Sequence, residues 1–144
     1  MGLDKNFPRY PYDVMSPDVR WYPGSDSVSE KLREKLLPPL VDKIRREVYE
    51  WRKKEYPNIS DVSQSLLNYW FKTNHKNNFQ YYFAQRESVE TIIYLYEHEK
   101  IRSLSELLKY DSSGVMVDSM FEETWLRLVV KQATGTGKTK VISL

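Results

Sequence analysis

Apolar residues recur at helical spacing through the segment that follows residue 31. Positions three or four apart share one face of a helix, so this run predicts helical structure. Pro38-Pro39 interrupts the run, which predicts two helices or one sharp kink, and Pro57 marks its end. Ser27 and Glu30 have the spacing of a capping box at its start. The apolar positions are Leu32, Leu36, Leu37, Leu40, Val41, Ile44, Val48 and Trp51.

Three more helices are expected before residue 111. We expect Asp61 to cap the first of them, and the polar stretch 72–78 to form a loop. A longer helix is expected over about Tyr82–Glu99. Ser103 and Glu106 again have capping-box spacing and predict a short helix that ends near Tyr110. The apolar positions of the first two are Val62, Leu66, Leu67, Trp70 and Phe71, then Phe83, Val89, Ile92, Ile93 and Tyr96.

The two ends of the chain have a different pattern. Residues 1–26 hold four prolines among aromatic residues, which predicts an extended arm, with a short edge strand at 12–14 or 20–22. Residues 111–124 resemble a loop. Trp125–Lys131 is short, apolar and β-branched, so it predicts a buried strand. The expected organisation is therefore an arm (1–26), a mainly α region (27–110) and the start of an α/β nucleotide-binding domain (111–144).

The amino-acid composition excludes few classes of function. The 144 residues have a net charge of +2, which neither requires nor excludes nucleic acid as a partner. There is no cysteine, as in many proteins of the reducing cytosol. His75 and His98 lack metal-ligand spacing. No apolar run approaches the length of a membrane span, and no signal-peptide core is present, so we expect a cytoplasmic protein without membrane contact.

The segment 133–139 reads Ala-Thr-Gly-Thr-Gly-Lys-Thr and directly follows the predicted strand. Glycines let main-chain N–H groups approach a ligand closely. In such a loop a lysine reaches the β- and γ-phosphates, and the following threonine hydroxyl binds Mg²⁺. The segment therefore predicts a phosphate-binding loop. The full pattern G-x-x-x-x-G-K-[ST] is not met, because Gln132 stands where its first glycine belongs. The expected phosphate-binding residues are Thr134, Gly135, Thr136, Gly137, Lys138 and Thr139, with Thr139 as the Mg²⁺ ligand.

A second candidate lies upstream, at the start of the 82–99 helix. The amide of Gln85 offers a donor and an acceptor side by side, which matches N7 and N6 of adenine. Tyr82 or Phe83 could stack on the base. The alternative is that Gln85 is an ordinary helix residue and that the aromatic residues belong to the core.

These two motifs together resemble superfamily 2 helicases of the DEAD/DEAH type, and most of all the R subunits of type III restriction enzymes. The resemblance lies in the helix Phe83-Ala-Gln-Arg-Glu-Ser-Val-Glu-Thr-Ile-Ile-Tyr-Leu95, the strand and the loop, and it covers about residues 79–144. It implies a RecA-like domain that binds ATP and Mg²⁺, with Gln85 reading adenine. It also implies double-stranded DNA as the substrate and a methyltransferase or modification subunit as a partner. Gln132 and the long interval from Gln85 to Lys138 depart from the family pattern.

The leading hypothesis is thus the N-terminal part of an ATP-dependent DNA helicase or translocase, truncated five residues after the loop. The Asp-Glu motif that such motors need is not in these 144 residues, so we expect no turnover. The alternative is a non-enzymatic helical interaction module with a remnant phosphate loop. A small nucleotide kinase is disfavoured, because those enzymes carry the loop near the N-terminus.

Overall fold

The computed structural model describes residues 11–19, 38–120, 125–132 and 134–144, and these are mainly helical. The capping box at Ser27–Glu30 and the edge strand considered at 20–22 lie outside the described residues. The α-helices are α2 (Val41–Lys53), α3 (Asp61–Lys72), α4 (Phe83–Ile93) and α5 (Lys138–Ile142). Shorter turns of helix are η1 (Pro17–Val19), η2 (Lys76–Asn78), η3 (Tyr94–His98), η4 (Ser105–Tyr110) and η5 (Asp118–Met120).

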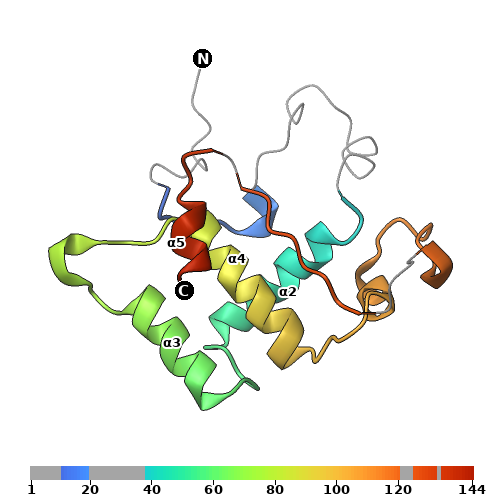
Figure 1. The fold of residues 1–144 in the computed structure, drawn as a ribbon, viewed down its shortest axis with the longest axis horizontal. Helices are drawn as coiled ribbons and strands as arrows, with labels where there is room; N and C mark the ends of the chain where they lie inside the picture. Colours follow the sequence, from blue (N-terminus) through green and yellow to red (C-terminus); the bar gives the residue numbers. More distant parts are fainter. Residues whose placement is uncertain (1–10, 20–37, 121–124, 133) are drawn as a thin grey trace.

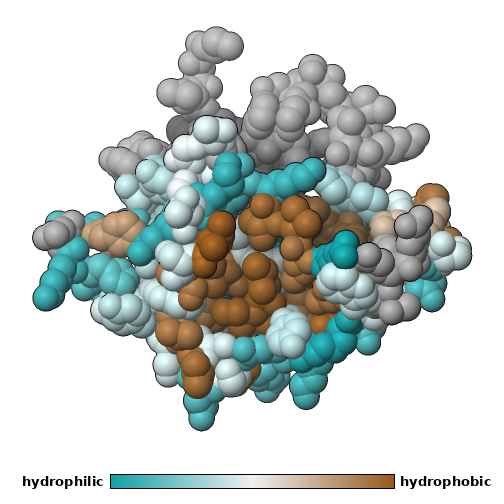
Figure 2. Space-filling model, viewed as in Figure 1, coloured by the Kyte–Doolittle hydropathy of each residue, from teal (hydrophilic) through white to brown (hydrophobic). Residues whose placement is uncertain are grey.

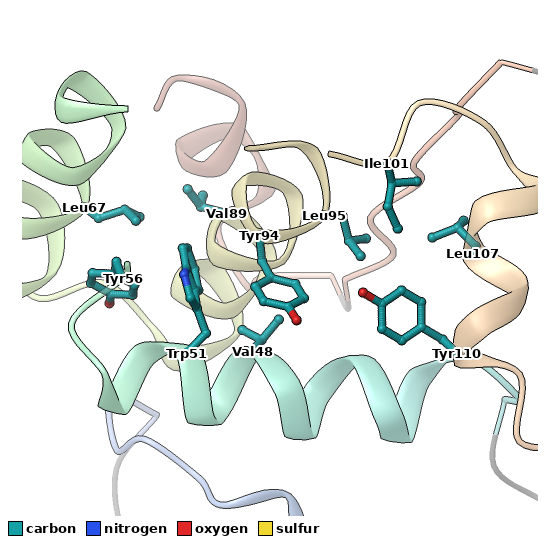
Figure 3. Close-up of a cluster of buried hydrophobic side chains, with 10 residues drawn as sticks. All are labelled: Val48, Trp51, Tyr56, Leu67, Val89, Tyr94, Leu95, Ile101, Leu107 and Tyr110. Atoms are coloured by element: carbon teal, nitrogen blue, oxygen red, sulfur yellow. The ribbon is translucent and has the colours of Figure 1, made fainter. Parts of the chain in front are cut away.

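Helix α4 lies at the centre of the molecule, in contact with α2, α3 and α5 (Figure 1). The C-terminal residues cross it as a coil before they enter α5. Ten buried side chains from α2, α3, α4 and the segments that follow them form one hydrophobic core (Figure 3). They are Val48, Trp51, Tyr56, Leu67, Val89, Tyr94, Leu95, Ile101, Leu107 and Tyr110.

The aromatic rings give this core its specific geometry. The ring of Trp51 lies edge-on to Tyr56 and Tyr94, with centroid separations of 4.9 and 5.3 Å. Such pairs contribute about 0.5–1.5 kcal/mol beyond the burial of their area. Trp51 also donates its indole N–H to the carbonyl of Pro57 at 2.9 Å, so its one polar atom is satisfied. These contacts hold the turn after α2 against the core.

The proline pair and a left-handed turn set the limits of α2. The helix begins at Val41, with Leu40 as its N-cap between it and Pro38-Pro39, so the predicted interruption at the proline pair precedes the helix. It ends at Lys53 rather than at Pro57, because Glu55 and Tyr56 have φ of 65° and 59° and leave the helical path. This turn carries Tyr56 into the core, where its side chain is fully buried. Tertiary burial here ends the helix before the proline does.

A buried charge cluster joins α2 to α4. Glu90 is fully buried and accepts hydrogen bonds from Arg52 Nε at 2.8 Å, Tyr56 Oη at 2.6 Å and Arg86 Nε at 2.8 Å. Burial opposes the charge on Arg86, but the neighbouring Glu90 outweighs it and raises the pKa of Arg86. A buried carboxylate is tolerated only when it is paired and hydrogen-bonded in this way. The cluster fixes α4 next to α2.

Two predicted helices differ from the structure in detail. The cap of α3 is Ser60 rather than Asp61: the Ser60 hydroxyl accepts the N–H of Ser63 at 3.2 Å. The helix predicted over 82–99 continues from α4 into a π-helical turn, η3. A π turn has more residues per turn than an α-helix, so the face that points inward changes. Tyr94 and Leu95 are buried in this turn, whereas Tyr96, which we expected inside, is exposed. Ile92, also expected inside, lies before the turn on the exposed side of α4.

The predicted strand at Trp125–Lys131 is not formed. Trp125 makes one isolated antiparallel bridge to Ser103, and residues 126–132 have no regular secondary structure. The described residues contain no sheet, and a strand needs a neighbour to satisfy its backbone. The edge strand considered at 12–14 is absent for the same reason. In the part of the chain that the structure describes, no helix is both long enough and apolar enough to cross a membrane.

Candidate functional site

The start of α4 is held by contacts with the arm and with its own side chains. The N–H of Phe83 donates to the carbonyl of Pro11 at 2.7 Å. The side-chain oxygen of Gln85 accepts the N–H of Tyr82 at 2.9 Å. The first N–H groups of a helix lack partners within the helix, so these bonds stabilise its first turn. They also fix the orientation of the Gln85 amide.

The other end of that amide reaches the phosphate-loop motif. Gln85 Nε2 donates to the carbonyls of Thr136 and Gly137, both at 3.1 Å. The side chain of Gln85 is only 5% exposed, so these bonds are shielded from water. The structure thus brings together two motifs that lie about fifty residues apart in the sequence.

The loop depends on two glycines in the left-handed region. Gly135 and Gly137 have φ of 83° and 75°, a conformation that costs other residues about 1–2 kcal/mol. A Cβ on Gly137 would lie 2.3 Å from Gln85 Nε2, whereas one on Gly135 would meet nothing within 4 Å. Glycine at 137 is therefore favoured by its backbone angle and by the position of the Gln85 amide, which an added Cβ would displace.

Helix α5 starts at the loop lysine. Lys138 is its first residue, and its side chain is exposed and folded back, with Nζ 3.1 Å from the carbonyl of Gln132. Thr134 and Thr139 are exposed as well. The ammonium of Lys140 lies 5.7 Å from the ring centroids of both Phe79 and Tyr81, which holds α5 against the segment that precedes α4.

The sequence analysis did not assign a role to Gln132 or to Ser88. Gln132 Nε2 donates to Ser88 Oγ at 2.8 Å and to the carbonyl of Ala84 at 3.2 Å. Its Oε1 accepts the hydroxyl of Thr136 at 3.4 Å. One signal was available: Ala84 and Ser88 are four residues apart and share the face of α4 next to Gln85. A second signal was that a polar residue, Gln132, takes the place of the glycine expected at that position.

The residues predicted to stack on adenine lie mostly in contacts with the rest of the chain. Phe83 is 7% exposed, and the guanidinium carbon of Arg52 lies 5.4 Å from its ring centroid. The ring of Tyr82 lies 5.4 Å from that of Tyr12 in a tilted arrangement. Of the three predicted residues, Gln85 is the one with hydrogen bonds to the loop described above.

The loop has the residues that a Mg²⁺–nucleotide complex needs on its phosphate side. Lys138 and the glycine-flanked backbone suit an anion, and Thr139 offers a hydroxyl for the metal. Among the described residues, no group of three His, Cys, Asp or Glu side chains could hold a metal ion by itself. A Mg²⁺ at Thr139 would therefore arrive with the nucleotide and take most of its ligands from phosphate and water.

The chain was compared with protein-family models, curated proteins and solved structures, and none of them matched.

Proposed function

We propose that residues 134–139 bind the phosphates of ATP together with Mg²⁺. The observation that carries the proposal is the pair of hydrogen bonds from Gln85 to the carbonyls of Thr136 and Gly137. A buried amide that holds the segment at Thr136 and Gly137 supports a formed loop rather than a free glycine-rich tail. By the resemblance described above, this phosphate-binding segment serves an ATP-dependent helicase or translocase that acts on double-stranded DNA.

Phosphate binding requires one local rearrangement. The ammonium of Lys138 contacts the carbonyl of Gln132, and it would exchange this neutral acceptor for a phosphate oxygen. A phosphate oxygen carries more negative charge than a carbonyl oxygen, so the exchange gives the ammonium a stronger electrostatic partner. Hydrolysis also needs carboxylates for the metal and for the attacking water. Because the 144 residues hold no Asp-Glu pair, we expect them to bind nucleotide without turnover.

Titration with a fluorescent ATP analogue in the presence of Mg²⁺ tests the proposal. We expect saturable binding to the unaltered chain and a loss of about tenfold to a hundredfold in affinity for Lys138→Ala, which removes a charge-assisted contact. Lys131→Ala is the matched control, because it removes a nearby exposed lysine outside the loop. Equal affinities of the Lys138→Ala and Lys131→Ala variants would contradict the proposal. ATP hydrolysis that depends on Lys138 would contradict only the expected lack of turnover.

The motor assignment has its own test. Because nucleotide and DNA binding are coupled in such motors, we expect a short DNA duplex to change the affinity for Mg-ATP, and Lys138→Ala to abolish that change. If nucleotide binds normally and DNA has no effect at any concentration, the phosphate site stands and the DNA assignment fails.

One observation favours a second function, a non-enzymatic interaction module. Apolar side chains gather on the face formed by α4, the coil 125–131 and α5 (Figure 2), and Val129 and Ile142 are 80% and 86% exposed. Large apolar patches on proteins commonly mark contact surfaces. A cooperative thermal transition that Mg-ATP does not shift would favour this module over nucleotide binding.

A further inference from the structure

Gln132 stands at the junction of three parts of the candidate site. Its side chain bonds to α4, its amide oxygen accepts from Thr136 in the loop, and its main-chain carbonyl accepts from Lys138 at the start of α5. The position is the one at which the full phosphate-loop pattern has a glycine, which has no side chain to make such contacts. This chain therefore holds its loop in a way that the pattern itself does not provide.

The hydroxyl of Ser88 orients the Gln132 amide. Ser88 Oγ donates its single proton to the carbonyl of Ala84 at 2.7 Å, so towards Gln132 it can act only as an acceptor. Gln132 must therefore turn its NH₂ group towards α4, where Ser88 Oγ lies at 2.8 Å. The amide oxygen then faces Thr136. The hydrogen bond from Ser88 to Ala84 thus sets the direction of the bond from Gln132 to Ser88, and this in turn sets the direction of the bond from Thr136 to Gln132.

Gln85 and Gln132 hold two different points of the loop on the same helix. Gln85 contacts the carbonyls of Thr136 and Gly137, and Gln132 fixes the entry of the loop, four residues before Thr136. Both points of the loop are thus attached to α4. Ordering a flexible loop on binding would lower affinity, and a loop that is already ordered avoids this cost.

We infer that Gln132 is a positioning residue for the phosphate loop and that Ser88 sets its orientation. Gln132 does not contact the nucleotide. It holds the entry of the loop on α4. It also places the main-chain carbonyl that accepts from Lys138 as long as no phosphate is bound. The effect on nucleotide affinity rests on the proposed function, that is, on phosphate binding by the loop. The attachment of the loop to α4 through Gln132 is a property of the chain without nucleotide.

The affinity for Mg-ATP is one readout. We expect Gln132→Ala and Ser88→Ala each to weaken binding about tenfold, since each removes at least one shielded hydrogen bond of the link. The double variant is expected to be no weaker than Gln132→Ala alone, because the two residues act through one link. Ser88→Thr keeps the hydroxyl and should bind within about twofold of the unaltered chain. Gln64→Ala is the matched control, since it removes an amide that donates to the carbonyl of Glu55, on another part of the chain.

Glycine amide signals are the second readout and need no nucleotide. The chain has five glycines, so selective ¹⁵N-glycine labelling gives a simple spectrum in which Gly135 and Gly137 can be assigned by substitution. We expect both signals to shift in Gln132→Ala and Ser88→Ala and to stay in place in Ser88→Thr and Gln64→Ala.

The two readouts separate the two proposals. Absence of Mg-ATP binding by the unaltered chain would overturn the proposed function, while the glycine signals would still decide the role of Gln132. Unmoved Gly135 and Gly137 signals in both alanine variants would overturn the inference, whatever the affinity for nucleotide. Unchanged affinity in folded Gln132→Ala, together with normal binding by the unaltered chain, would overturn it as well. A lower melting temperature with unchanged signals and affinity would show a role in stability only and would also reject it.

Discussion

Gln85 and Gly137 approach so closely that a side chain on the glycine would displace the Gln85 amide. The amide nitrogen of Gln85 lies 3.1 Å from the carbonyl oxygen of Gly137, and a Cβ on that glycine would come within 2.3 Å of the same nitrogen. The glycine is therefore part of a contact between α4 and the loop, in addition to its role in the turn. This distinguishes it from Gly135, where the surrounding space is open.

The first prediction compares alanine at these two glycines. Both substitutions strain a left-handed residue by about 1–2 kcal/mol, but only Gly137→Ala also collides with Gln85. We expect Gly135→Ala to weaken Mg-ATP binding by about tenfold and Gly137→Ala by about a hundredfold or more. Titration of both variants with a fluorescent nucleotide measures the difference. Gln85→Ala should add little to the loss in the Gly137→Ala background, because the added Cβ has already displaced the Gln85 amide, and a double variant that binds about tenfold more weakly than Gly137→Ala would contradict the collision.

The helices could be predicted from the sequence because apolar periodicity is a local signal. Val48 and Trp51 of α2 and Leu67 of α3 lie in the core as their spacing required. The π turn after Ile93 could not, because no residue pattern distinguishes it from a continued α-helix. The strand prediction at Trp125–Lys131 was wrong for another reason. Apolar, β-branched residues favour a strand, but the strand forms only where a neighbour pairs with its backbone.

The site shows the same division between local and distant information. The glycines and Lys138 were evident from the loop motif, and Gln85 was predicted to read adenine from its amide chemistry and from the resemblance. The hydrogen bonds from Gln85 and Gln132 could not be predicted, because they join residues that only the tertiary fold brings together. The sequence also placed Phe83 near a base, whereas the fold buries its ring under Arg52.

The second prediction concerns the buried carboxylate of Glu90. Glu90→Gln removes the negative charge that compensates Arg52 and Arg86, and a buried charge without its partner costs about 3–5 kcal/mol. We expect the free energy of unfolding in urea to fall by about that amount. Glu50→Gln is the control, because its carboxylate is exposed and pairs with Lys53 at the surface. A difference below about 1 kcal/mol between the two variants would show that Glu90 does not carry the charge of the cluster.

The third prediction is a pH dependence that depends on Glu97. Burial opposes ionisation of this carboxyl, but hydrogen bonds from the Ser63 hydroxyl and the Ser60 N–H outweigh it and lower its pKa below the usual 4.5. A carboxyl whose pKa is lower in the folded state stabilises the fold at pH values above its pKa in the unfolded state. This stabilisation is lost as the pH falls through the folded value. We therefore expect the urea midpoint to decrease as the pH falls from the usual pKa of 4.5 through the lowered pKa of Glu97.

Glu97→Gln separates this carboxyl from the others that protonate in the same range. The variant should be less stable than the unaltered chain at neutral pH and should lose less of its remaining stability on acidification. Glu50→Gln also removes one carboxylate but leaves the start of α3 untouched, so it should keep the full decrease. Parallel curves for the Glu97→Gln variant and the unaltered chain would reject the assignment.

The last prediction decides what Gln85 does for a bound nucleotide. A glutamine that reads adenine must offer one N–H to N7, yet both N–H bonds of Gln85 point to carbonyls of the loop, and its oxygen accepts from Tyr82. We therefore expect Gln85 to act by holding the loop. The Gln85→Ala variant should weaken Mg-ATP and Mg-GTP by the same factor, about tenfold, since the phosphates are common to both. Competition titrations with the two nucleotides on the same variant measure that ratio directly. A loss confined to ATP would instead mean that the amide leaves the carbonyls of Thr136 and Gly137 and turns to the base when nucleotide binds.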